Sequence, residues 1–337
     1  MKLKRAIISA VVAASAAAIF IYPDEIKSGV IEGLALCAEV IIPSMFIFAV
    51  LANFAAESGA ARLIALPVSY LFSPLFKIPK NAVYAVIMSF ISGYPVGAAG
   101  VARLYKNGEI DRITAVRMLS FCVNASPPTV IVAIGGLLGS YKIGWIMYGS
   151  HILASILIGA VTAVFIKMPE IKKTVPTKQK SPAECFVNAT AEACSQMMAI
   201  SGFVVFFCAV MSVIGDNSPY LTAVLEVTSG AKLLAASGAS VPIIAGLIGF
   251  GGIAVICQVM SIAKGIASLT ELLFERVANG VLTTAICTAC LKLFGESIDA
   301  MSNIAGNSVR LSIVAAPATA AMLAMAAAFL AALRQKN

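Results

Sequence analysis

The chain has 337 residues and a formal net charge of +8, and it is 60% hydrophobic but only 12% charged. Soluble globular proteins are nearer half apolar and a quarter charged, so this composition excludes an ordinary soluble domain and indicates a polytopic membrane protein. The cations flank apolar segments, as Lys2, Lys4 and Arg5 do before the first one, which is the positive-inside pattern and not a nucleic-acid-binding surface.

Uncharged runs set the predicted fold class, which is all-α. A hydrocarbon core about 30 Å thick needs about 20 helical residues at 1.5 Å each. Several runs reach or approach that length: 81–102, 118–141, 143–166, 193–214, 233–263 and 311–333. We therefore expect an α-helical protein of a bacterial plasma membrane.

The N-terminal part, residues 1–29, is predicted to be an anchor helix that begins in the cytoplasm. Its apolar stretch, 6–22, is not followed by a small-residue cleavage site, so we expect it to be retained. A second helix is predicted at 30–54. The stretch 61–80 contains Pro67 and Pro74 and is interpreted as a broken interfacial helix.

A first repeat is predicted over 30–166, with a re-entrant hairpin at about 81–106. Cations flank the apolar run 81–102 on both sides, so a hairpin that enters and leaves by one face suits it better than a span. Helices at 114–138 and 143–166 follow. The lysine-rich segment 167–186 is then a cytoplasmic linker.

A second repeat, of inverted topology, is predicted over 187–294, with a hairpin at about 218–237. Its other helices are expected at 187–214, 241–263 and 270–293, and a C-terminal transmembrane helix is expected within 295–337. This assignment gives about eight spanning helices and two hairpins, with both termini cytoplasmic. Most of the 24 Lys and Arg residues then lie on the cytoplasmic side.

The candidate site residues are those that interrupt the apolar runs. Backbone groups left unpaired in hydrocarbon cost several kcal/mol each, so irregular backbone at membrane depth is expected only beside protein or a water-filled cavity. We expect the interruptions to converge on one cavity, with half-helix N-termini facing a polar or anionic solute. They comprise Ser92, Gly93, Tyr94, Pro95 and Gly97, then Asn124, Ala125 and Ser126, then Glu226, Thr228, Ser229 and Gly230, and finally Phe250, Gly251 and Gly252.

Each candidate also has a plainer interpretation. The glycines fit close helix packing, and Gln258 fits either an interhelical hydrogen bond or the site. Arg117 either snorkels to the interface or binds a carboxylate. Glu226, at the centre of a hairpin, has three possible roles: it accepts a hydrogen bond from the solute, it carries a proton, or it forms an ion pair with Lys232.

The expected ligands are a small solute and the lipid bilayer, with homo-oligomers left open. Asn124 and Ser126 beside an unwound turn have oxygens that could coordinate Na⁺, so the coupling ion is expected to be Na⁺ or H⁺. The sequence contains no P-loop, HExxH, GxSxG or metal-ligand cluster, and we expect neither an enzyme, nor a cofactor, nor a nucleic-acid partner.

The segments SFISGYPVGAAGVARLYKNGEID, AVRMLSFCVNASPPTVIVAIGGLLGSYKIG, LEVTSGAKLL and GFGGIAVICQVMSI resemble the nucleoside-recognition, or Gate, domain. Over about 30–295 the chain is similar to the YlbJ-type sporulation integral membrane proteins of spore-forming bacteria. Gate proteins in turn resemble concentrative nucleoside transporters, which have inverted repeats, hairpins and unwound helices.

The resemblance implies an alternating-access transporter of a small anionic solute, a dicarboxylate such as dipicolinate, in the plasma membrane or outer forespore membrane. Two half-helix N-termini and Arg117 would face the dianion. The alternatives are a nucleoside or nucleobase carrier and a non-transporting scaffold of spore-envelope assembly.

Overall fold

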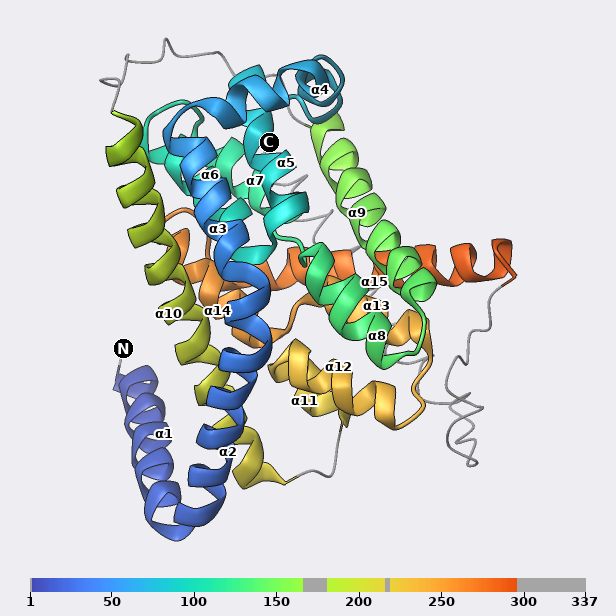
Figure 1. The fold of residues 1–337 in the computed structure, drawn as a ribbon. Coiled ribbons are helices and arrows are strands. Elements are labelled where there is room, and N and C mark those ends of the chain that lie inside the picture. Colours follow the sequence, from blue (N-terminus) through green and yellow to red (C-terminus); the bar gives the residue numbers. More distant parts are fainter. Residues whose placement is uncertain (1, 166–180, 216–218, 296–337) are drawn as a thin grey trace.

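The computed structural model describes residues 2–165, 181–215 and 219–295, and this part of the chain is helical, without strands (Figure 1). The all-α prediction is therefore confirmed. The predicted C-terminal helix and most of the predicted linker lie outside the described residues.

The N-terminal third begins with two helices joined at Tyr22. Pro23 stands at the first position of the second helix, where its missing N–H costs no hydrogen bond. That helix begins at Pro23, seven residues before the predicted start of the second helix at 30. The elements are α1 (Lys2–Ile21), α2 (Pro23–Leu36), the π-helical turn η1 (Cys37–Ile41), α3 (Ile42–Glu57) and α4 (Ala60–Phe76).

Helix α4 corrects the expected broken helix at 61–80. It runs unbroken through Pro67 and Pro74, because each proline removes only one backbone hydrogen bond and membrane helices tolerate that loss. The break lies earlier, at Ser58 and Gly59, where the chain bends by 84° between the segments Met45–Glu57 and Ala60–Phe76.

The region predicted as the first re-entrant hairpin, about 81–106, contains two short helices that pack against each other around Gly93, hereafter the first hairpin. Gly97 makes this packing possible, since a Cβ placed there would lie 2.4 Å from Cβ of Ser89. Buried Glu109 secures the base of the hairpin by accepting hydrogen bonds from Arg62 at 2.7 Å and Asn81 at 2.5 Å. The elements are η2 (Lys80–Ala82), α5 (Val83–Ser92) and α6 (Tyr94–Lys106).

The helix predicted at 114–138 is interrupted over residues 122–126, where the NASPP sequence begins. The helix predicted next, at 143–166, is continuous. The elements are α7 (Arg112–Phe121), the π-helical η3 (Pro128–Ile134), α8 (Gly135–Leu137) and α9 (Tyr141–Val164).

The second half of the chain repeats this order with one long helix, a hairpin, an interrupted helix and a final helix. The long helix begins at Pro182 and not at 187, because Ser181 and Glu184 form a capping box there. The hairpin closes where a Cβ on Gly230 would lie 2.0 Å from Cα of Ala223. The elements are α10 (Pro182–Ile214), α11 (Pro219–Leu225), α12 (Val227–Ala236), α13 (Val241–Phe250), α14 (Gly252–Ile262) and α15 (Leu269–Leu293).

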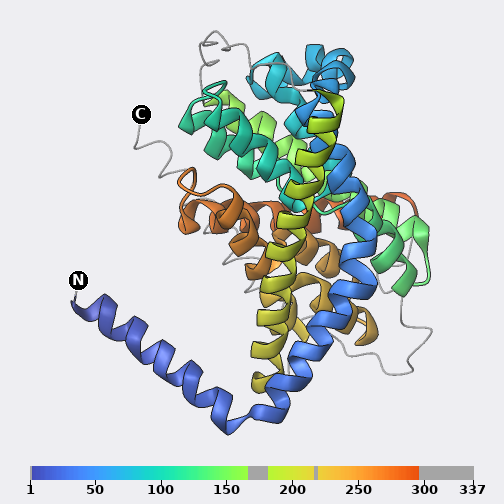
Figure 2. The same cartoon turned by 60° about the vertical axis from the view of Figure 1, so that its left-hand side comes forward.

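The two halves pack along their long helices. A Cβ on Gly33 of α2 would lie 2.7 Å from Cα of Val205 on α10, and both views show α2–α3 beside α10 (Figures 1 and 2). In Figure 1 the α5–α6 hairpin lies in the upper part of the view and the α11–α12 hairpin in the lower part. In this view α13, α14 and α15 lie between them, whereas α7 lies beside α6.

Three helices in the described residues are long and apolar enough to cross a membrane: Tyr141–Val164, Pro182–Ile214 and Val241–Ile262. The bent pair Met45–Glu57 and Ala60–Phe76 is a fourth candidate. Large apolar side chains on these helices face outward, such as Met198 with 75% of its surface exposed and Leu63 with 73%. Such an exterior suits lipid, and the described helices do not reach the predicted count of eight spans.

Candidate functional site

The first hairpin and the first interrupted helix meet at their breaks. Gly93 has φ +91° and ψ −173°, a conformation available to glycine alone, and it brings the hairpin tip onto the unwound segment. A Cβ on Gly93 would lie 2.9 Å from Cβ of Ser126. The two irregular segments thus shield each other's backbone from lipid.

The second hairpin and the second interrupted helix meet in the same way. A Cβ on Gly252 would lie 3.2 Å from the amide nitrogen of Val227, the first residue of α12. A Cβ on the adjacent Gly251 would lie 3.5 Å from Cε1 of Tyr94, at the tip of the first hairpin. All four predicted breaks therefore converge.

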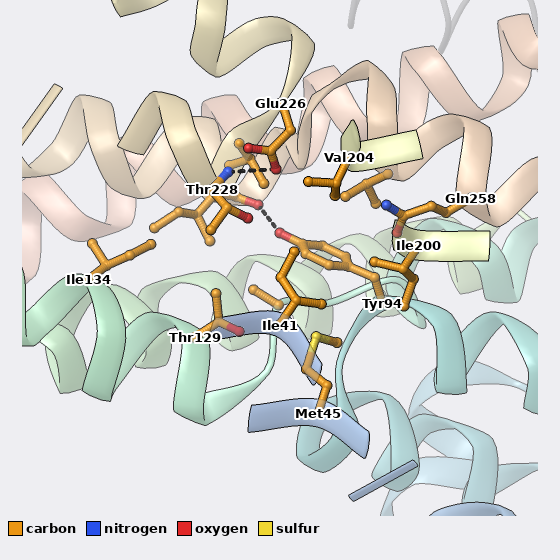
Figure 3. Close-up of a pocket in the computed structure, with 14 residues that line it drawn as sticks. Ile41, Met45, Tyr94, Thr129, Ile134, Ile200, Val204, Glu226, Thr228 and Gln258 are labelled. Carbon is orange, nitrogen blue, oxygen red and sulfur yellow. Dashed lines mark hydrogen bonds between the residues drawn. The ribbon is translucent and has the colours of Figure 1, made fainter. Parts of the chain in front are cut away.

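A cavity of about 40 Å³ lies at this convergence, with room for a few water molecules (Figure 3). Both halves of the chain form its wall. The lining residues are Ile41, Met45, Tyr94, Ala125, Thr129 and Ile134 from the first half and Ile200, Val204, Glu226, Val227, Thr228, Ile248, Val255 and Gln258 from the second.

Glu226 is the acidic group of this wall, and it is only 3% exposed. It is the N-cap of α12, where its carboxylate accepts hydrogen bonds from the amides of Thr228 at 2.9 Å and Ser229 at 2.6 Å. These amides are the free donors of the half-helix N-terminus. The side chain of Glu226 thus occupies the position where an anionic solute was expected.

Tyr94 joins the two halves across the cavity. Its hydroxyl donates a hydrogen bond of 2.7 Å to the carbonyl oxygen of Ile248, close to the break in the second interrupted helix (Figure 3). Its ring forms part of the wall. The hydroxyl is therefore a polar link between the first hairpin and α13.

Among the described residues, no lysine or arginine lines the cavity. Arg117, expected near an anionic solute, donates instead to the carbonyl oxygen of Lys77 at 3.0 Å. No ion pair between Glu226 and Lys232 occurs among the described residues. The electrostatic character of the wall is set by Glu226, Thr129, Thr228, Tyr94 and Gln258.

Asn124 lies outside the cavity wall, at the centre of a buried polar network. Its amide donates to Ser89 at 3.1 Å, and its oxygen accepts from Ser155 at 2.5 Å. Ser155 in turn accepts from Asn279 at 2.9 Å, and Asn279 accepts from Thr283 at 3.2 Å. The network ties α5, α9 and α15 to the unwound segment.

Two further groups secure the unwound segment. His151, fully buried on α9, accepts a hydrogen bond of 3.1 Å from the amide of Ala125. Arg276, 1% exposed on α15, donates to the carbonyl oxygens of Ser120, at 2.7 Å, and Val123. The guanidinium thus stands at the carbonyl end of α7.

The residues around Asn124 and Ser126 do not fit the expected Na⁺. The Asn124 oxygen already accepts from Ser155, and the Ser126 hydroxyl is 2.8 Å from that of Thr129. The neighbouring carbonyls of Ser120 and Val123 face the Arg276 guanidinium. In the described part of the chain, no three His, Cys, Asp or Glu side chains are grouped to hold a metal ion.

The structure thus brings five of the predicted residues into one wall: Tyr94, Ala125, Glu226, Thr228 and Gln258. The others shape the breaks or lie behind the wall: Ser92, Gly93, Pro95, Gly97, Arg117, Asn124, Ser126, Ser229, Gly230, Phe250, Gly251 and Gly252. Sequence reasoning missed Thr129 and the apolar residues of the wall. Thr129 follows the predicted NASPP interruption directly and could have been found there, whereas Ile41 and Ile200 look like any apolar position of a membrane helix.

The described part of the chain has the fold of an all-helical membrane protein. Residues 38–141 match the family described as Gate, nucleoside recognition, a range that includes the first hairpin and the first interrupted helix. The chain is also similar to the sporulation integral membrane protein YlbJ of Bacillus subtilis (strain 168), with 24% identity over 292 residues, 72% of this chain and 71% of that protein.

No solved structure matches the chain. The resemblance predicted from the sequence, to Gate and YlbJ-type proteins, is confirmed. The protein is a multi-pass membrane protein related to a sporulation protein.

Proposed function

We propose that this protein is an alternating-access carrier of a small polar solute in the membrane of a spore-forming bacterium, and not an enzyme. The observation that carries the proposal is the convergence of four helix breaks on one cavity walled by both halves of the chain. Carriers built from repeats place their solute at such a junction, because unwound backbone is stable only there.

The proposed membrane arrangement is the inverted repeat with hairpins from opposite sides, about eight spans and cytoplasmic termini. The repeated element order and the separate positions of the two hairpins support it. The sporulation relative supports the plasma membrane or the outer forespore membrane as the location.

Among the expected solutes, the wall favours an uncharged one that donates hydrogen bonds, such as a nucleoside. Glu226 can accept such bonds, and Thr129, Thr228 and Gln258 add polar partners. A dicarboxylate such as dipicolinate would meet the Glu226 carboxylate without a lysine or arginine in the wall. Two negative charges in contact inside a protein repel each other strongly, so a dianion would have to be neutralised before it binds here.

The cavity of about 40 Å³ is smaller than such a solute requires, so this conformation is closed. Binding would separate α13 from the first hairpin and enlarge the cavity. The Tyr94–Ile248 hydrogen bond spans that boundary and would open with it.

Uptake by proteoliposomes tests the proposal. We expect saturable uptake of radiolabelled uridine by the wild-type protein, at least tenfold lower uptake by Glu226→Gln, and weaker uptake of dipicolinate. The control is Glu271→Gln, at the exposed N-terminus of α15. If neither solute is bound or carried, the scaffold alternative holds, and faster uptake of dipicolinate would reverse the proposed solute preference.

A further inference from the structure

We infer that Arg276 is a tethered cation that takes the place of a coupling Na⁺ at the break in the first interrupted helix. The protein would then bind its solute without Na⁺. The inference concerns the ion at the α7 break and goes beyond the proposed carrier function.

The carbonyl end of a half-helix attracts positive charge. The last carbonyls of a helix have no intrahelical donors and carry the negative end of the helix dipole. In a membrane interior this charge needs a cation or hydrogen-bond donors nearby. The helix α7 ends at Phe121, and the five residues that follow are not helical.

Arg276 supplies both the charge and the donors. Its two terminal nitrogens bind the carbonyl oxygens of Ser120 and Val123. Another carbonyl at this end, that of Phe121, accepts from the Asn124 amide at 2.8 Å. The side chain is 1% exposed, so the guanidinium is a permanent part of the interior.

A second cation at this place would lack ligands and would be repelled. The side-chain oxygens nearest the break, those of Asn124 and Ser126, are engaged by Ser155 and Thr129. A guanidinium within a few ångström would repel Na⁺ strongly in a low-dielectric interior. A tethered charge also cannot leave with the solute, so it cannot supply the driving force of an Na⁺ gradient.

The thermal stability of the purified protein tests this inference, whatever the solute is. For the wild-type protein in detergent, we expect the same Tm in sodium, potassium and choline chloride of equal ionic strength. A saturable rise of Tm that is specific for Na⁺ would overturn the inference. This comparison of salts uses the wild-type protein alone.

The variant Arg276→Ala leaves a space of guanidinium shape at two carbonyl oxygens. We expect its Tm to fall by on the order of 10 °C, since two charge-assisted hydrogen bonds are lost. Guanidinium chloride at low millimolar concentration should recover at least half of that loss, and sodium chloride should recover less.

Arg112→Ala is the matched control, because Arg112 also joins α7 to α15, through Glu271 at 3.6 Å, but with 53% of its side chain exposed. We expect a small change of Tm and no recovery by guanidinium. A folded Arg276→Ala variant that responds to guanidinium no more than this control would overturn the inference. If Arg276→Ala does not fold, the wild-type comparison of salts decides.

Discussion

At the scale of single residues, Glu226 has two separable roles, as the cap of α12 and as the acid of the cavity wall. Asp is among the best N-cap residues, but its side chain is one methylene shorter than that of Glu, so its carboxylate reaches less far into the cavity. We expect Glu226→Asp to keep the Tm of the wild type within a few degrees and to weaken uridine binding. Glu226→Gln should lose about 1 kcal/mol of stability, because a neutral amide caps a helix less well.

Equilibrium binding and thermal melts on the same preparations separate the two roles. Normal binding by Glu226→Asp and Glu226→Gln alike would limit Glu226 to capping. It would then have no part in solute recognition.

The hydroxyl group of Tyr94 can be tested separately from its ring. Tyr94→Phe keeps the ring in the wall but leaves the buried carbonyl oxygen of Ile248 without this donor. We expect a loss of about 1–2 kcal/mol in the closed state, measured as a lower Tm. Because the lost bond holds the cavity closed, the solute affinity should not fall with it. Tyr148→Phe is the control outside the cavity, because it also removes a hydrogen bond from a tyrosine hydroxyl to a backbone carbonyl, that of Phe90.

At the scale of elements, two glycines close the hairpins. A Cβ on Gly97 would lie 2.0 Å from the carbonyl oxygen of Cys122, and one on Gly230 would lie 2.0 Å from Cα of Ala223. We therefore expect Gly97→Ala and Gly230→Ala each to cost about 2–4 kcal/mol, because backbone must move in a packed interior.

Gly202→Ala on α10 is the matched control, because its Cβ would meet no atom within 4 Å. It should leave the Tm unchanged or raise it slightly. Measured melts in which all three variants behave alike would mean that the hairpins are not packed at these glycines.

The positions of the breaks were predictable because glycine, proline and polar residues seldom cluster inside an apolar run unless the helix is interrupted there. The groups that satisfy the broken ends were not predictable. Arg276 and Asn279 stand on a regular helix, with no local turn to mark them, and only the tertiary contact with α7 and α9 reveals their role. The prolines of α4 led to the wrong prediction of a broken helix at 61–80. A proline interrupts a helix only where the loss of one backbone hydrogen bond cannot be tolerated.

At the scale of the whole molecule, the predicted inverted topology assigns each loop to one side of the membrane. On a background without reactive cysteines, a cysteine at Gly108, between α6 and α7, should be protected from an impermeant maleimide in intact cells. Cysteines at Gly139 and Gly238 should react. An added Cβ at these three glycines meets no atom within 4 Å, but each has a left-handed φ of 69–73°, so each cysteine should cost about 1–2 kcal/mol of backbone strain. Labelling is therefore compared only on variants that reach the membrane at the level of the parent protein. Labelling of all three positions would contradict the inverted repeat.

The central claim is that both halves of the chain form one solute site. The most direct test is equilibrium binding of uridine to the purified protein with one wall hydroxyl removed from each half, in Thr129→Val and Thr228→Val. We predict that each substitution weakens binding by about tenfold, the value of one buried hydrogen bond to a solute. Normal affinity in both variants, or a loss in one half alone, would contradict a shared site.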